Sequence, residues 1–296
     1  MQQDIVCFGE ILWDILPSGA MPGGAPMNVA FHLKQLGLSP AIITRIGNDA
    51  WGEKLIQLLT EQDLSTAHIQ TDKQYSTGLV NAETKENNEV VYDIRYPAAW
   101  DFIEASKEAE VAVQNAGYFV FGSLAARSDK SRTTLLQLLP AANIKVLDIN
   151  LRPPHFSKEF ILQLLTQADI LKLNEHEIKL ISGWLNSYSD IHDQLKAIEG
   201  KFDLHAVLVT MGNAGAILSQ NGKLIKHKGY RVKVADTIGS GDAFLAAFLS
   251  QTISGSSAED ALAFANALGA FVASMTGAWP GYKVADILQL MKEEQG

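Results

Sequence analysis

Short apolar runs alternate with segments of helical pattern along most of this chain. Most of the runs end at Gly, Asn or Asp, which is typical of buried strands followed by a turn. The strand-like runs are 5–9, 41–47, 118–123, 145–150, 170–174 and 206–212, and the helical segments are 28–37, 52–62, 131–142 and 159–168. The alternation predicts an α/β fold, with a doubly wound, mostly parallel sheet flanked by helices on both faces. Ligands of such sheets bind outside the carboxyl ends of the strands.

One stretch interrupts this alternation. Residues 76–94 read STGLVNAETKENNEVVYDI, two strand-like runs around the polar tip Lys85-Glu86-Asn87-Asn88, and they predict a β-hairpin. Residues 11–19, ILWDILPSG, add a second extended piece that ends abruptly. We interpret roughly 11–20 and 75–97 as a small β lid inserted into a single α/β domain that spans 1–296. An ordinary surface hairpin is the alternative.

The composition excludes several classes of protein. The 296 residues, 47% of them hydrophobic, can bury a substantial core. The formal net charge of −9, without a block of basic residues, argues against nucleic acid or an anionic membrane surface as a partner. No uncharged apolar stretch reaches the ~18 residues that span a bilayer, and the N-terminus lacks a signal-peptide pattern. We therefore expect a cytoplasmic protein with no membrane partner.

A glycine-rich turn precedes a helical pattern in residues 236–249, DTIGSGDAFLAAFL. The N–H groups of a helix N-terminus are unpaired and lie at the positive end of the macrodipole, and glycines let a ligand approach the backbone. The turn can therefore bind an anion. Asp242 fits two roles, the N-cap of the helix or a general base beside a bound phosphate. The Walker A and dinucleotide-binding patterns are absent.

A second glycine-rich element, GGAPMNVA, occupies residues 23–30. Asn28 opens the predicted helix, either as its N-cap or with its amide directed toward sugar hydroxyls. Together with 236–249, this element resembles the two signatures of the ribokinase-like (PfkB) carbohydrate kinase family, and within it the fructokinases. The resemblance extends over essentially the whole chain. Further similar stretches are GEILWD (9–14), RYPAAWD (95–101), DINLR (148–152), NEHE (174–177), VTMGNAGA (209–216) and ANALGA (265–270).

The resemblance implies a sugar kinase that uses ATP and Mg²⁺, with fructose as the preferred acceptor. It implies that Asp242 is the catalytic base and that the backbone of Gly239, Ser240 and Gly241 forms an anion hole. The implied substrate contacts are Asp14, Gly24, Asn28, Arg95 and Arg152, and the implied nucleotide contacts are Asn174, Thr210, Gly212, Gly215 and Asn266. Glu177 is expected to help hold Mg²⁺ through water, and Asp236 with the carbonyl of Ile238 to contribute to a K⁺ site.

Local alternatives stay open for some of these residues. Asn174 and Glu177 also fit a capping box, in which each side chain bonds the other residue's backbone N–H. Arg152 also fits a solvated charge at a strand end. For the whole chain, the alternatives are a kinase for another sugar or sugar acid, such as ribose or 2-keto-3-deoxygluconate, and a non-catalytic sugar- or nucleotide-binding regulator. If the lid exposes strand edges, two lids are expected to pair in a homodimer.

Overall fold

The computed structural model describes residues 3–16, 19–84, 90–186, 188 and 190–293. The predicted hairpin tip at 85–88 and residues 17–18 of the expected lid lie outside the described residues. The strands are β1 (Ile5–Phe8), β2 (Leu12–Leu16), β3 (Gly19–Gly23), β4 (Pro40–Gly47), β5 (Ile69–Asp72), β6 (Gly78–Thr84), β7 (Val90–Ile94), β8 (Tyr118–Gly122), β9 (Ile144–Asp148), β10 (Ile170–Asn174), β11 (Ala206–Thr210), β12 (Ala216–Gln220) and β13 (Lys223–His227). The α-helices are α1 (Ala25–Gln35), α2 (Ala50–Glu61), α3 (Lys107–Asn115), α4 (Asp129–Leu138), α5 (Lys158–Leu165), α6 (Glu175–Leu185), α7 (Ile191–Phe202), α8 (Ser240–Ile253), α9 (Ala258–Ala273) and α10 (Val284–Glu293).

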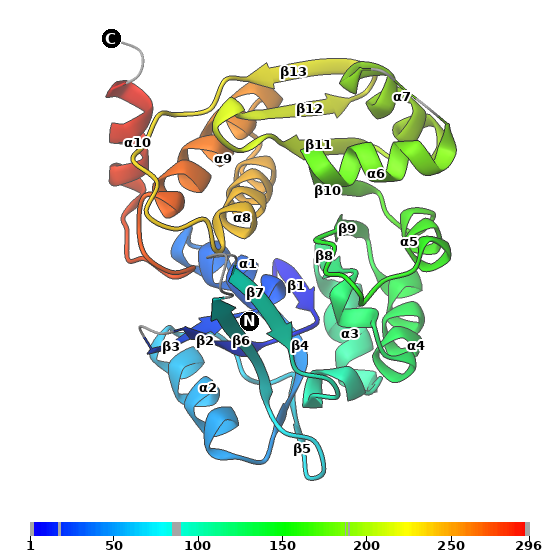
Figure 1. Ribbon diagram of the computed structural model, residues 1–296, viewed down its shortest axis with the longest axis vertical. Coiled ribbons are helices and arrows are strands. Elements are labelled where there is room, and N and C mark those ends of the chain that lie inside the picture. The colour runs from blue at the N-terminus through cyan, green and yellow to red at the C-terminus, as the bar shows by residue number, and fades with distance from the viewer. Residues whose placement is uncertain (1–2, 17–18, 85–89, 187, 189, 294–296) are drawn as a thin grey trace.

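The main sheet has nine strands in the order β13-β12-β11-β10-β9-β8-β1-β4-β5. The strands from β11 to β5 in this order pair in parallel, whereas β12 pairs in antiparallel orientation with both of its neighbours, β11 and β13. Figure 1 shows α1, α2, α8, α9 and α10 on one side of this sheet and α3 to α7 on the other. The predicted doubly wound, mostly parallel α/β fold is confirmed.

Two hydrophobic cores lie on the two faces of the main sheet. In β1, Ile5 and Cys7 belong to one core, while Val6 and Phe8 belong to the other. All four side chains are fully buried, because successive side chains of a strand point to opposite faces and helices cover both faces. This is the physical reason why the strand-like runs of the sequence are mostly apolar and do not alternate between apolar and polar residues.

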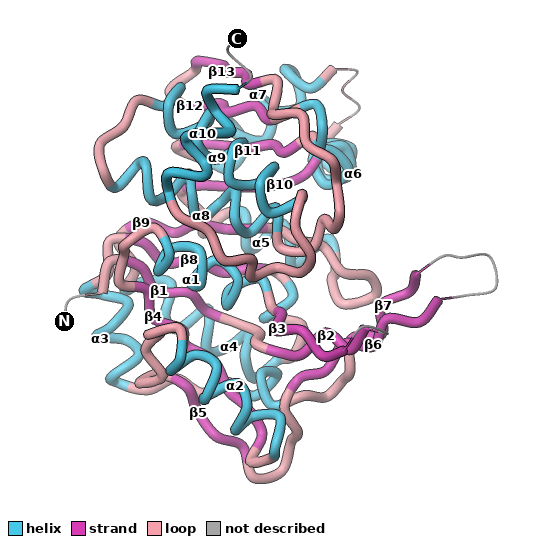
Figure 2. Tube along the Cα trace, turned by 90° about the vertical axis from the view of Figure 1, so that its left-hand side faces the viewer, coloured by secondary structure: helices cyan, strands magenta, loops and turns pink. Residues whose placement is uncertain are grey.

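A smaller sheet of four strands has the order β3-β2-β6-β7. β2 pairs with β3 in antiparallel and with β6 in parallel orientation. Figure 2 shows this sheet projecting from the body of the molecule. The chain enters the small sheet directly after β1, so the small sheet lies next to the carboxyl edge of the main sheet.

The helices begin earlier than their apolar patterns indicate. Asp49 caps α2 and Ser128 caps α4, each accepting a backbone N–H of the first turn with its side chain. The interpretation of Asn28 as an N-cap is wrong. Helix α1 begins at Ala25, with Gly24 as N-cap and Pro26 in the first turn, where its missing N–H costs no hydrogen bond. None of the helices in the described part of the chain is long and apolar enough to cross a membrane.

Candidate active site

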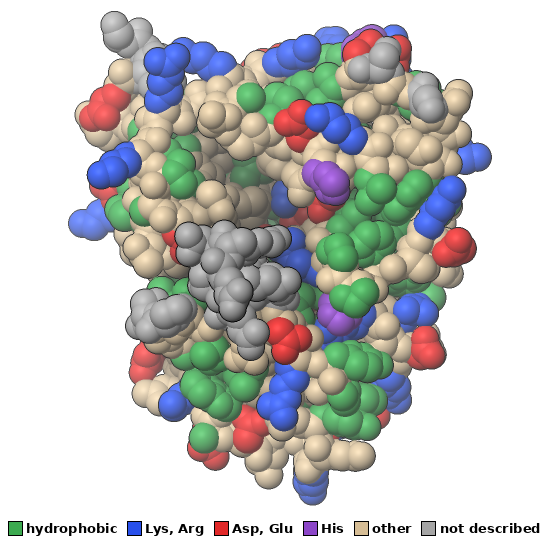
Figure 3. Space-filling view, in the orientation of Figure 1, with side chains coloured by type: hydrophobic (Ala, Val, Ile, Leu, Met, Phe, Trp, Pro, Cys, Tyr) green, Lys and Arg blue, Asp and Glu red, His purple; other side chains and the backbone are tan. Residues whose placement is uncertain are grey.

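Two cavities meet at the first turn of α8. One has a volume of about 660 Å³ and the other of about 440 Å³. Thr210, Thr237 and Gly241 line both cavities. The space-filling view shows the face of the molecule that is hollowed there (Figure 3). The turn predicted to bind an anion is therefore a shared wall between two ligand-sized spaces.

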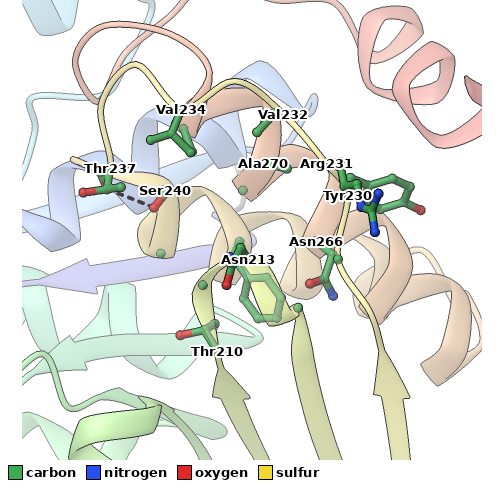
Figure 4. A pocket seen from close by; sticks show the side chains of 17 residues that line it. Thr210, Asn213, Tyr230, Arg231, Val232, Val234, Thr237, Ser240, Asn266 and Ala270 are labelled. Atoms are coloured by element: carbon green, nitrogen blue, oxygen red, sulfur yellow. Dashed lines mark hydrogen bonds between the residues drawn. The ribbon is translucent and has the colours of Figure 1, made fainter. Parts of the chain in front are cut away.

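The backbone before α8 explains the glycines of the turn. Gly239 is the N-cap, with a φ of 74° in the left-handed region, and a Cβ there would lie 2.5 Å from the Cβ of Ala278. The Ser240 N–H donates to the Thr237 carbonyl at 3.3 Å, and its hydroxyl donates to the same oxygen at 2.9 Å (Figure 4). Gly241 follows within the first turn, whose N–H groups have no acceptor inside the helix. The Ser240 N–H, which was expected to belong to the anion hole, is thus engaged within the turn, and the N–H groups that follow it in the first turn remain as donors for an anion.

Asp242 is the third residue of α8, so its interpretation as the N-cap is wrong. Its side chain is buried, and its Oδ2 accepts a hydrogen bond of 2.8 Å from Asn28 Nδ2. Burial raises the pKa of Asp242 to about 6, although the nearby Lys172 ammonium opposes this shift. A carboxyl group with this pKa is largely ionised at neutral pH and able to accept a proton.

The sequence interpretation missed Lys172 and Asp148. Lys172 Nζ lies 2.8 and 3.0 Å from the two carboxylate oxygens of Asp148, and both side chains are buried. A Cβ on Gly241 would lie 3.1 Å from the same Nζ, so the ammonium sits directly beneath the turn. Burial alone would lower the pKa of Lys172, but Asp148 and then Asp242 raise it. The signal in the sequence was a lysine inside the apolar run ILKLN.

The smaller cavity collects most of the predicted substrate contacts. Its lining includes Asp14, Gly24, Asn28 and Arg152 together with Asp242. Burial raises the pKa of Asp14 to about 6, opposed by Arg152. The carboxylate of Asp14 packs directly against Gly23, where any Cβ would collide with it.

The residues that line the smaller cavity differ from the expected substrate contacts at two positions. Arg95 is exposed and is not among the residues that line the smaller cavity, although the preceding Ile94 is. Glu10, which the interpretation missed, lines this cavity and is buried. Its Oε2 has no hydrogen-bond partner among the described residues, and burial raises its pKa to about 7. Glu10 therefore offers a free acceptor to a ligand.

The larger cavity collects the predicted nucleotide contacts. Thr210, Gly212, Gly215 and Asn266 all line it, and Figure 4 shows Thr210 and Asn266 around the same space. Gly215 has a φ of 85°, and a Cβ there would collide with the carbonyl of His227. Glycine is therefore required where the turn after β11 packs against the chain that follows β13.

Asn174 and Glu177 form the capping box of α6. Glu177 N–H donates to Asn174 Oδ1 at 2.9 Å, and Asn174 N–H donates to Glu177 Oε2 at 2.8 Å. The other carboxylate oxygen of Glu177 accepts the Leu151 N–H at 2.8 Å. Asn174 also lines the smaller cavity, whereas Glu177 is buried below it. Because both oxygens of Glu177 are engaged, these residues fit a metal ion that is held through water rather than bound directly.

Asp236, which was expected to contribute to a monovalent-cation site, joins the turn before α8 to the segment after α9. Its Oδ1 accepts the Ile238 N–H at 3.0 Å, and its Oδ2 accepts the Gly277 N–H at 3.1 Å. The backbone of 236–238 thus lies beside the segment around 277. Backbone carbonyls from two adjacent loops are a donor set that suits K⁺, so the residues present fit such an ion.

The comparisons with known proteins agree with this geometry. The chain has a ribokinase-like α/β fold. It aligns with a structure of fructokinase with bound ATP from Xylella fastidiosa (TM-score 0.88, 21% identity, 100% of both chains). It also aligns with a putative ribokinase II from E. coli in complex with ATP and Mg²⁺ (TM-score 0.86, 20% identity, 98% of this chain and 99% of that one).

Sequence comparison gives the family. The model of the pfkB family carbohydrate kinases matches residues 19–283. The probable fructokinase-5 of Arabidopsis thaliana is 30% identical over 325 residues, which cover 98% of each chain, and the probable fructokinase-6, chloroplastic, of the same plant is 30% identical over 93% of this chain and 79% of its own. The chain belongs to the pfkB family of carbohydrate kinases, and it is an ATP-dependent sugar kinase.

Proposed function

We propose that the chain transfers the γ-phosphoryl group of ATP to a hydroxyl of fructose, with Asp242 as the general base. The observation that carries this proposal is the position of the first turn of α8, between the two cavities and shared by both. A phosphoryl group that passes from one cavity to the other meets the backbone of Gly239 to Gly241. The Ser240 N–H is engaged by the Thr237 carbonyl, so the remaining N–H groups of the first turn and the positive helix end stabilise negative charge that develops there.

Each cavity takes one reactant in this proposal. The larger one holds ATP against Thr210, Gly212, Gly215 and Asn266. The smaller one holds the sugar against Asp14, Gly24, Asn28 and Arg152. The predicted contact of Arg95 with the sugar stays a prediction, and the exposed position of this residue does not support it.

Asp242 acts on the sugar hydroxyl. It accepts the hydroxyl proton while the hydroxyl oxygen forms a bond to the γ-phosphorus, and the bond from this phosphorus to the bridging oxygen of ADP breaks. The products are the sugar phosphate and ADP, and the proton resides on Asp242. Mg²⁺ bound with ATP would neutralise phosphate charge, with Asn174 and Glu177 as the residues that hold it through water. Asp236 and the Ile238 carbonyl belong to the proposed K⁺ site.

The charges of the smaller cavity favour a neutral sugar over a sugar acid. Glu10, Asp14 and Asp242 contribute three carboxyl groups to its lining. Lys172 and Asp148 form an ion pair that adds no net charge, so Arg152 is the remaining cation among the lining residues. Fructose is chosen among neutral sugars because the relatives with the highest identity named above are fructokinases by name.

The four-stranded sheet is the proposed lid, within a single domain that spans 1–296. Its outer strands are β3 and β7, whose free edges can pair with another lid in a homodimer. Closure over the sugar would exclude water and suppress hydrolysis of ATP. Light scattering tests the homodimer, which a monomeric mass at the assay concentration would refute.

An ADP-release assay over a sugar panel tests the function. The panel contains fructose, ribose and 2-keto-3-deoxygluconate, each with ATP and Mg²⁺. We expect the highest kcat/KM with fructose. Faster turnover of either other compound would reassign the acceptor. If the protein binds ATP tightly but releases no ADP with any sugar of the panel, the interpretation as a kinase gives way to that of a sugar- or nucleotide-binding regulator.

A further inference from the structure

A chain of two hydrogen bonds links Asp242 to a tryptophan in the loop after α9. Trp279 Nε1 donates to Asn28 Oδ1 at 2.9 Å, and Asn28 Nδ2 donates to Asp242 Oδ2 at 2.8 Å. The three residues come from α8, from α1 and from the loop between α9 and α10. Segments that are about two hundred and fifty residues apart in the sequence therefore meet at the proposed base.

The indole group fixes which way the Asn28 amide faces. Indole N–H is a donor only, so the amide atom that faces Trp279 has to be the oxygen. The amide nitrogen then faces Asp242 and donates to its carboxylate. Without the indole N–H, the amide could rotate by half a turn and place its oxygen against Asp242, which would repel the ionised form.

Helix α1 holds Trp279 in place. The indole ring stacks on Phe31 with ring centres 4.3 Å apart and an angle of 9° between the planes. His32, the residue after Phe31, contacts the same loop through both ring nitrogens. Its Nε2 lies 3.0 Å from the Ala278 carbonyl oxygen, and its Nδ1 lies 3.0 Å from the Tyr282 hydroxyl. Burial lowers the pKa of His32 to about 4, so the ring is neutral. Because the carbonyl can only accept, Nε2 carries the proton and Nδ1 accepts from Tyr282.

The same loop also contacts the anion-binding turn. Ala278 lies against Gly239, where a Cβ would have no room. Ala278 and Trp279 are adjacent, so one short segment contacts both the N-cap of α8 and the amide that bonds the proposed base. A shift of this segment would change the position of the turn and of Asp242 together.

From this arrangement we propose that Trp279 is a positioning residue that acts through Asn28 on Asp242. It keeps the amide donating to Oδ2, which leaves Oδ1 as the oxygen that takes the proton of the acceptor hydroxyl. The second hydrogen of Asn28 Nδ2 stays available to the sugar. The inference rests on the proposed role of Asp242 as the base.

The hydrogen bond from Asn28 favours the ionised form of Asp242, and other charges face the same carboxylate. Lys172 on β10 and Arg152 after β9 also favour the ionised form, whereas Asp148 on β9 opposes it. Glu10, after β1, and Asp14, on β2, interact with Asp242 as like charges. Trp279→Phe leaves all of these groups in place and removes only the indole N–H. Its effect on the titration of Asp242 is therefore specific to the amide.

The first measurement is the pH profile of kcat for Trp279→Phe, which retains an aromatic ring against Phe31. We expect kcat to fall about tenfold near pH 6, because a hydrogen bond to a charged group is lost or reversed. The acid limb should move to higher pH, while KM for ATP stays unchanged. A kcat and an acid limb equal to those of the wild type would overturn the inference. Trp184→Phe, in α6 on the other face of the sheet, is the matched control and should match the wild type.

A double-mutant cycle tests whether Trp279 acts through Asn28. In an Asn28→Ala background, Trp279→Phe should cause no further loss of kcat. Equal losses in both backgrounds would show that Trp279 acts by another route and would overturn the inference.

Carbon NMR of the carboxyl groups in the ligand-free protein separates this inference from the proposed function. The Asp242 signal is assigned by its loss in Asp242→Asn. Its titration midpoint should be higher in Trp279→Phe than in the wild type, whether or not any sugar is phosphorylated. Identical midpoints would overturn the inference even for an active kinase.

Discussion

Lys172 and Asp148 form an ion pair of 2.8 Å at the carboxyl edge of the main sheet, directly beneath the first turn of α8. The pair places a positive charge under the backbone that is proposed to bind the transferred phosphoryl group. Burial alone would lower the pKa of Lys172, but Asp148, Asp242 and Glu177 together outweigh it and raise this pKa, so the lysine stays protonated. The site thus combines a helix N-terminus with a fixed cation below it.

Replacing both members of this pair separates its structural role from its role in phosphoryl transfer. Lys172→Met leaves Asp148 as an uncompensated buried charge and should cost about 3–5 kcal/mol of unfolding free energy. Lys172→Met with Asp148→Leu should recover most of that stability, because an apolar pair of similar volume is tolerated. The kcat of the double variant should stay at least about tenfold below the wild type, since the cation is missing.

Urea denaturation and kcat measurements check these expectations. A double variant with full kcat would show that the lysine serves the fold alone. Lys179→Met is the control, because Lys179 pairs with Glu175 on the exposed surface of α6. Its unfolding free energy should change by less than about 1 kcal/mol.

Gly215→Ala tests the proposal that the larger cavity binds ATP. A Cβ at this position collides with the His227 carbonyl, and the φ of 85° adds strain. We expect KM for ATP to rise at least about tenfold with little change in KM for the sugar. Gly212→Ala is the matched control, because Gly212 lines the same cavity with a φ of 55° but a Cβ there meets no atom within 4 Å. If both substitutions raise KM for ATP equally, backbone strain alone explains the change. That result would contradict the explanation by a collision at position 215.

The reaction should depend on pH through Asp242. A general base works in its ionised form, and burial raises the pKa of this carboxyl group to about 6. We therefore expect kcat to rise as the pH increases through about 6 and to level off above it. Initial rates at saturating sugar and ATP between pH 5 and 8 check this. A kcat that does not change between pH 5 and 7 would contradict it.

The same pKa shift predicts that Asp242 destabilises the folded protein at neutral pH. The folded pKa of about 6 exceeds the ordinary value of 3.8 for an aspartic acid, so the contribution of Asp242 to stability is lost as the pH rises through 6. Asp242→Asn removes the buried charge and should raise the unfolding free energy at pH 8 by about 3 kcal/mol. Below about pH 4 the two proteins should be equally stable.

Urea denaturation at both pH values checks this prediction. Asp129→Asn is the control, because the side chain of Asp129 is exposed. A variant Asp242→Asn that is no more stable than the wild type at pH 8 would show that the buried charge is fully compensated by its partners.

The main sheet could be predicted because its strands are buried on both faces. Runs such as 5–8 and 206–209 are apolar at consecutive positions, as a sheet covered by helices on both faces requires. Helix starts were less accurate, because a capping residue such as Asp49 is polar and precedes the apolar pattern. Strand β13 lacked this signal, since it is an edge strand with exposed lysines.

The candidate site was predictable where local backbone sets the geometry. Gly239 to Asp242, Gly215 and Asn174 all lie at turns or helix starts that their own sequence specifies. Lys172, Glu10 and Trp279 were missed because their roles depend on tertiary contacts. Trp279 reaches Asn28 only after the loop behind α9 folds back onto α1, and no local pattern encodes that contact.

The most direct test of the whole account is the rate of sugar phosphate formation from ATP and fructose by the wild type and by Asp242→Asn. Phosphorus NMR identifies the product, and titration with ATP confirms that both proteins bind the nucleotide. The account predicts product formation by the wild type and a rate about 10²–10⁴-fold lower for Asp242→Asn at unchanged ATP affinity. A variant that forms the sugar phosphate at nearly the wild-type rate would contradict it.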